Sequence, residues 1–102
     1  IMKNPQELEQ VKAILSIVAE IAPGHAVEVR IPPYAAIQCV EGPKHTRGTP
    51  PNVVEMNAET LFALVKGEKK WNDGIEDGSI HASGERSNLE SLFSSVMNRM
   101  SA

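Results

Sequence analysis

The sequence predicts an α+β fold, with one domain over residues 1–102, a small and mostly antiparallel sheet of about four to five strands, and helices packed on one face. The chain has 102 residues, which is the length of one domain. Segments with helical apolar spacing stand at both ends of the chain. Short segments typical of strands lie between them, mostly next to one another, which favours an antiparallel sheet.

The first helix is predicted over residues 5–22. Asn4 suits the cap, Pro5 suits the first helical position, and Glu7 stands three residues beyond the cap. Pro23 and Gly24 end the pattern. The face expected to meet the core consists of Leu8, Val11, Leu15, Val18 and Ala22, and Ile14 and Ile21 lie beside it.

The natural start of the chain is expected at Met2, because Ile1 precedes a methionine. We therefore expect residues 1–4 to be a cloning remnant or a disordered N-terminus. The apolar periodicity that follows is interrupted by charged residues, so it does not resemble a signal peptide.

Two strands are predicted on either side of the Pro32-Pro33 pair, since neither proline can donate to a ladder. Residues 27–31 alternate apolar and charged side chains, which indicates a half-buried strand. Residues 34–40 are apolar apart from Gln38 and indicate a more central strand. We expect the two to pair antiparallel, with a third strand over residues 53–56.

The second half of the chain alternates helices and one short strand. Asn57 is expected to cap a helix that runs to about residue 66 and ends at Gly67. A further short helix is predicted over residues 68–76. A fourth strand is predicted over residues 79–83, with Ile80 and Ala82 facing the core and His81 facing solvent.

The last helix carries the most regular apolar stripe in the sequence, and Ser87 with Glu90 has the spacing of a capping box. The stripe consists of Leu89, Leu92, Phe93, Val96, Met97 and Met100. It either fills the core or covers an apolar ligand site, and the two methionines suit an adaptable surface.

Composition excludes several partners. The formal net charge is −3, so the chain lacks the cationic field expected of a nucleic-acid-binding protein. No apolar run approaches the roughly 20 residues of a membrane span, so no stable membrane insertion is expected.

Cys39 is the only cysteine, so it cannot form an intramolecular disulfide. Its position in the middle of a predicted strand suits a buried, inert thiol. We expect a cytoplasmic protein.

No pattern in the sequence indicates a catalytic or metal site. His25, His45 and His81 share no metal-ligand spacing. No glycine-rich phosphate loop, serine elbow or carboxylate pair is present. We therefore expect no enzyme activity, no cofactor and no bound metal.

The segment EGPKHTRGTPPNVVE, residues 41–55, is a long connection stiffened by prolines. It places His45 and Arg47 two residues apart, where a stiff loop can hold both cations against a carboxylate or phosphate. Alternatively, Arg47 pairs with Glu41 or Glu55 and braces the loop. Catalysis by His45 and Arg47 is a third reading.

Two segments carry a family resemblance. TLFALVKGEKKWNDGIEDGSIHASGE resembles the central motif of sterol carrier proteins: a Leu-x-x-Leu helix ending at glycine, a short helix, then a glycine turn into an alternating strand. RIPPYAAIQCVEGPKHTRGTPPNVVE resembles the small bacterial members of that family. The resemblance implies a sheet of about five strands with helices across one face. In the lipid-carrying members, an apolar tunnel lies between the two layers.

The resemblance also implies a function. We expect non-enzymatic binding of a lipid-like, fatty-acyl or sterol-type ligand. The expected ligand-binding residues are Leu61, Leu64 and Val65 as walls, Phe93, Val96 and Met97 as a lid, and His45 and Arg47. The alternative is a protein-interaction or accessory domain without a cavity, which binds another polypeptide or forms a homodimer.

Overall fold

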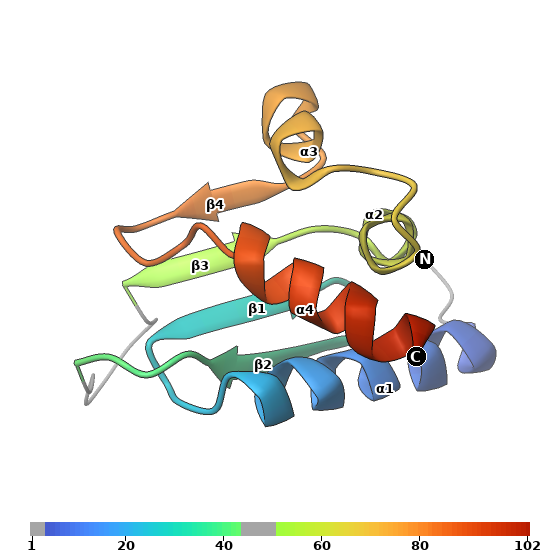
Figure 1. The fold of residues 1–102 in the computed structure, drawn as a ribbon, viewed down its shortest axis with the longest axis horizontal. Coiled ribbons are helices and arrows are strands. Elements are labelled where there is room, and N and C mark those ends of the chain that lie inside the picture. Colours follow the sequence, from blue (N-terminus) through green and yellow to red (C-terminus); the bar gives the residue numbers. More distant parts are fainter. Residues whose placement is uncertain (1–3, 44–50) are drawn as a thin grey trace.

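The computed structural model describes residues 4–43 and 51–102 (Figure 1). In that part of the chain, four helices and four strands follow one another in the order α, β, β, β, α, α, β, α. Their bounds are α1 Pro5–Ile21, β1 Val27–Ile31, β2 Ala35–Cys39, β3 Asn52–Glu55, α2 Ala58–Val65, α3 Trp71–Asp77, β4 His81–Ser83 and α4 Glu90–Ser101.

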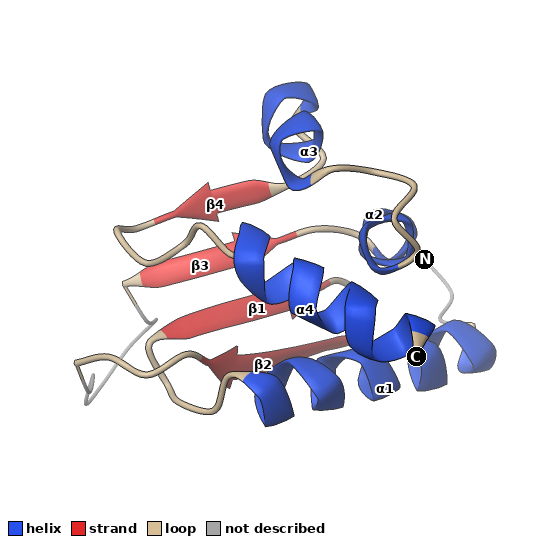
Figure 2. Ribbon diagram, viewed as in Figure 1, coloured by secondary structure: helices blue, strands red, loops and turns tan. Residues whose placement is uncertain are grey.

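The strands form one sheet in the order β2-β1-β3-β4. The prediction that residues 34–40 form a more central strand is wrong, because β2 lies at the edge of the sheet, where α1 contacts it. Figure 2 shows α1 and α4 lying across the same face of this sheet. α1 contacts β2 and α4, and α2 packs against α4, while α3 lies beyond the β4 edge (Figure 1). The predicted α+β class, with helices on one face of a four- to five-stranded sheet, is confirmed.

Strand pairing is mostly antiparallel, as expected. β1 pairs antiparallel with β2 across the proline turn, and β3 pairs antiparallel with β4. The central pair, β1 with β3, is parallel. Cys39 at the end of β2 and Asn52 at the start of β3 both stand opposite Val27, so β3 has to run in the same direction as β1.

β1 shows why the sheet has one dry face and one polar face. Val27, Val29 and Ile31 are fully buried under the helices, whereas Glu28 and Arg30 point to the other face and form an ion pair there. The period-two alternation of the sequence thus determines which face the helices cover.

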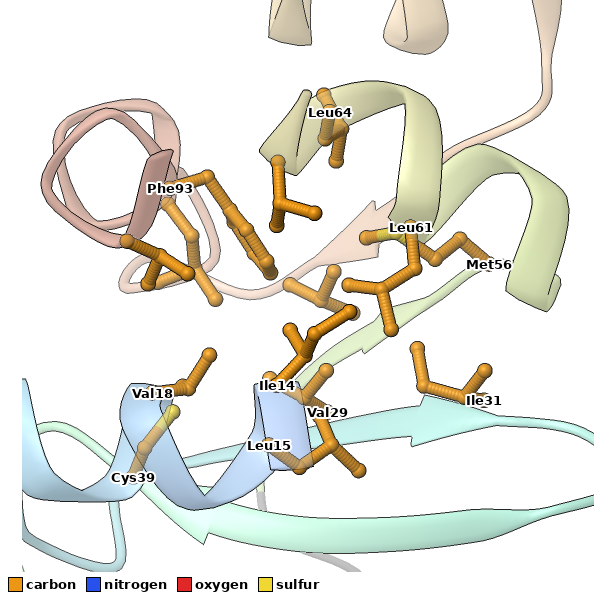
Figure 3. Close-up of a cluster of buried hydrophobic side chains, with 14 of the residues drawn as sticks. Ile14, Leu15, Val18, Val29, Ile31, Cys39, Met56, Leu61, Leu64 and Phe93 are labelled. Atoms are coloured by element: carbon orange, nitrogen blue, oxygen red, sulfur yellow. The ribbon is translucent and has the colours of Figure 1, made fainter. Parts of the chain in front are cut away.

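The core fills the space between the sheet and the helices (Figure 3). Leu61 and Leu64 of α2 and Phe93 of α4 point toward Val18 of α1 and Val29 of β1 in this view. The largest side chains with essentially no exposure are Leu15, Ile31, Leu61, Val11, Val18, Val27, Val29, Val54, Val96 and Cys39.

Two of the three predicted helix caps are confirmed. The Asn4 side chain accepts hydrogen bonds from the backbone N–H groups of Gln6 and Glu7, at 2.9 and 3.2 Å. The Asn57 side chain accepts one from Thr60, at 2.8 Å. Each satisfies N–H groups that the first helical turn leaves unpaired.

The predicted capping box of α4 is wrong. The Ser87 hydroxyl donates to the Gly84 carbonyl at 2.7 Å, which closes the preceding turn. α4 begins later, at Glu90, and the Asn88 side chain accepts from the Glu90 N–H at 3.1 Å. The Ser87 hydroxyl therefore closes the local turn instead of capping α4.

The short helix α3 begins three residues later than predicted. The backbone N–H of Gly67 donates to the Leu64 carbonyl, and those of Glu68 and Lys69 donate to the Ala63 carbonyl. Residues 67–69 therefore close the C-terminal end of α2 instead of starting a new helix.

Cys39 is completely buried, as expected, and burial raises the pKa of its thiol from an ordinary value of 9.0 to about 11. The unfolded chain releases this proton first, so the stability attributable to Cys39 is complete below pH 9 and is lost between pH 9 and 11. The loss is about 1.4 kcal/mol per pH unit.

This prediction is checked by denaturant unfolding at pH 8, 9, 10 and 11, in parallel with a Cys39→Ala variant. The free energy of unfolding of the native chain is expected to fall more steeply above pH 9 than that of the variant. Equal slopes would show that the thiol does not contribute.

Candidate functional site

Leu61 and Val96, two of the six apolar residues expected to bind a ligand, lie fully inside the core. Figure 3 shows the Leu61 side chain directed toward the sheet. A ligand would reach either residue only if the core opened. The other four predicted residues border two surface grooves, one on each side of the contact between α2 and α4.

The first groove is called the Trp71 groove. It has a volume of about 290 Å³ and includes Leu64, Phe93 and Met97 of the predicted set. Its lining residues are Leu64, Gly67, Lys69, Lys70, Trp71, Asn72, Glu90, Phe93, Ser94 and Met97. It opens between α2, α3 and α4, and it does not include the β1 side chains that face the core.

Aromatic stacking forms the floor of the Trp71 groove. The rings of Trp71 and Phe93 stack with centroids 6.0 Å apart and planes inclined by 19°. Aromatic pairs commonly adopt this geometry. Both residues are buried, so a ligand in this groove meets little of either ring. The polar rim, which includes Lys70 and Glu90, would provide much of the remaining contact.

One lysine of this rim is already engaged. The Lys69 ammonium donates to the Asp77 carboxylate at 2.5 Å. Hydrogen bonds from Lys69 and Ser79 hold the pKa of the Asp77 carboxyl below its usual range. This pair ties the α2–α3 connection to the end of α3, and it leaves Lys69 less available for an anionic ligand.

The second groove is called the α1–α2 groove, and its volume is about 270 Å³. It is lined by Gln10, Ala13, Ile14, Ile17, Phe62, Val65, Lys66 and Met100. Six of these eight residues are apolar, and none is acidic. The side chains of Gln10 and Lys66 supply the only polar groups of the lining outside the backbone.

Helical spacing explains how this groove forms. Ala13, Ile14 and Ile17 follow one another along one side of α1 at steps that place them on a common face. Phe62 and Val65 of α2 are three residues apart and form the opposite wall. Met100 of α4, a residue that is 43% exposed, borders the space between the two helices.

One exposed ion pair links the C-terminal end of α4 to α1. Arg99 donates to the Glu20 carboxylate at 2.9 Å. Because both side chains are substantially exposed, the pair contributes little to stability. The packing of α4 against α1, rather than this pair, places Met100 beside α1.

The sequence identified Val65 but missed the rest of the α1–α2 groove. A signal was present in the α2 segment TLFALV. Its four large apolar residues, Leu61, Phe62, Leu64 and Val65, are more than the core-facing side of a helix this short can hold. Phe62 is accordingly only half-buried. Ile17, beside the main stripe of α1, carries the same kind of signal and is also half-buried.

His45 and Arg47 lie outside the residues that the structure describes, so their predicted anion-binding or bracing role stays a prediction. At the end of the same connection, the buried Asn52 side chain donates to the Ala26 carbonyl and accepts from the Arg86 N–H, both at 2.9 Å. These two bonds hold the start of β3 against two other segments of the chain.

The described part of the chain contains neither a cluster of metal ligands nor a membrane-spanning helix. Within residues 4–43 and 51–102, no three His, Cys, Asp or Glu side chains gather as a metal site would require. None of the helices in the same ranges has the length and apolar character needed to cross a bilayer.

A family model described as "Bacterial SCP ortholog" matches residues 4–94, which is most of the chain. No curated protein matches the sequence. The family match includes both resembling segments, the whole sheet and α1, α2 and α3, and it ends within α4 at Ser94. The chain therefore belongs to the family of bacterial sterol carrier protein (SCP) orthologs.

Proposed function

We propose that the protein is a non-enzymatic binding protein for a lipid-like, apolar ligand, and that the α1–α2 groove holds the apolar part of that ligand. One observation carries the proposal: a mostly apolar lining with polar side chains from Gln10 and Lys66. Sites for small molecules commonly combine an apolar lining with a few orienting polar groups. Family membership supports the same function.

The size of the groove sets the expected affinity. Burying about eight methylenes gives about 6 kcal/mol at about 0.8 kcal/mol each, before ordering costs. That free energy corresponds to a dissociation constant of tens of micromolar at best. Weak, reversible binding of this kind suits a protein that takes up and releases its ligand.

Titration of the protein with a fluorescent fatty-acid analogue tests the proposal. We expect saturable binding, and we expect Ala13→Phe to weaken it at least tenfold because the new ring occupies the groove. Ser16→Phe, on an exposed position of α1 outside the groove, is the matched control and is expected to bind normally. Absence of saturable binding up to the solubility limit of the analogue would contradict the proposal.

We also propose a second ligand position in the Trp71 groove, which is lined by the predicted wall residue Leu64 and the predicted lid residues Phe93 and Met97. Trp71 is the only tryptophan in the chain, so its fluorescence reports on that groove. If the ligand also enters between α2 and α4, the emission of Trp71 changes on saturation. If it occupies the α1–α2 groove alone, the emission stays constant.

A protein-interaction role is the second candidate, and the β4 edge favours it. A groove of about 450 Å³ lies there, with Ile75, Val53 and His81 among its lining residues. Ile75 is 40% exposed and lies beside an edge strand, where its apolar surface is available to a partner. Cross-linking in cell extract, with Ile75→Glu as the comparison, would reveal a stoichiometric partner, and sedimentation would reveal a homodimer.

A further inference from the structure

We infer that the α1–α2 groove is specific for unbranched, medium-chain carboxylates with about ten carbons, and that it rejects ring systems of sterol size. The inference rests on the proposed function and narrows it to one chemical class. Three features of the groove carry it: its length along α1, its width between two anchored walls, and the charge at its rim.

The length of the groove follows from the α1 residues that line it. Gln10 and Ile17 mark its two extremes on that helix. Seven residues at about 1.5 Å each correspond to about 10 Å along the axis. An extended chain advances about 1.2 Å per backbone bond, so the groove accommodates about nine carbon–carbon bonds.

The width is limited because both walls belong to the core. Ile14 of α1 and Val65 of α2 line the groove, yet each is 4% exposed and sits in the core cluster. Moving these walls apart would disturb close-packed side chains. At about 270 Å³, the groove is smaller than the roughly 300–1,000 Å³ of sites that enclose drug-sized molecules. A single chain fits this space, and a fused-ring system does not.

Charge at the rim selects the head group. Lys66 is exposed, forms no ion pair with any residue in the described ranges, and is the only charged lining residue. An anionic head can therefore lie beside its ammonium while the chain lies along Ala13 and Ile17. Because an exposed ion pair contributes little, the expected selectivity for the anion is modest, up to about fivefold.

Calorimetric titration with straight-chain carboxylates of six to sixteen carbons, each below its critical micelle concentration, tests the inference. Affinity is expected to rise about fourfold per methylene up to about ten carbons and then to level off. The alcohol with ten carbons is expected to bind up to about fivefold more weakly than the carboxylate. Lys66→Gln removes that difference, whereas Lys70→Gln, at the rim of the Trp71 groove, preserves it.

The outcomes separate this inference from the proposed function. Affinity that continues to rise through sixteen carbons, equal affinity for the alcohol, or displacement of decanoate by a soluble sterol would overturn the specificity while leaving apolar-ligand binding intact. Absence of saturable binding for every chain length, together with no binding of the fluorescent analogue, would overturn both.

Discussion

Replacing Leu61 with alanine is expected to lower the free energy of unfolding by about 2–5 kcal/mol. Leu61 is 0% exposed, and its side chain lies between α2 and the sheet (Figure 3). Truncation removes apolar contacts and leaves a cavity that the surrounding side chains fill only partly. For a domain of about 100 residues, each 1 kcal/mol lowers the melting temperature by roughly 4–8 °C.

Thermal and denaturant unfolding of the variant measure this effect. Met100→Ala is the matched control, because it truncates an exposed side chain of similar size and is expected to change stability by less than about 0.5 kcal/mol. A loss below 1 kcal/mol for Leu61→Ala would mean that Leu61 lines a space already open to a ligand. The family resemblance would then give the better account of this residue.

Replacing Gly24 with alanine is expected to lower the free energy of unfolding by roughly 3–5 kcal/mol. Gly24 has φ +145°, which side chains rarely adopt, and a Cβ there would lie 2.1 Å from the Val40 carbonyl oxygen. That oxygen accepts from the Ala26 N–H at 3.0 Å, while the Val40 N–H donates to the Ala22 carbonyl at 2.7 Å. The turn after α1 is thus bonded to the end of β2 with no space for a methyl group.

Gly78→Ala provides the matched control for Gly24→Ala. Gly78 also has a positive φ, +82°, but nothing lies within 4 Å of a Cβ built there. Its substitution carries only the backbone penalty, about 1–2 kcal/mol. Similar losses of stability at the two positions would show that the contact with Val40 is unimportant.

Much of the fold could be predicted from the sequence because the relevant signals are local. The 3.6-residue spacing in α1, the alternation of β1 and the caps at Asn4 and Asn57 each involve residues close in the chain. The direction of β3 could not be predicted in the same way. It depends on Cys39 and Asn52 both pairing with Val27 in the sheet. No local sequence pattern specifies this pairing between residues far apart in the chain.

The candidate site was harder to predict than the fold for a related reason. An apolar residue at helical spacing has the same signature whether it fills a core, like Leu61, or lines a groove, like Phe62. Only the packing of α1 against α2 and α4 distinguishes the two. Ser87 shows the same limit on a smaller scale. The capping box would have its hydroxyl oxygen accept from the Glu90 N–H, but in the structure the hydroxyl donates to the Gly84 carbonyl instead.

The central claim is that the core is closed and that an apolar ligand lies outside it, between α1 and α2. Backbone amide and methyl NMR spectra of the protein titrated with decanoate test this claim most directly. We expect shift changes at Ala13, Ile17, Val65 and Met100, with Val29 and Val54 on the inner face of the sheet unchanged. Large changes at Val29 and Val54 would place the ligand between sheet and helices and contradict the claim.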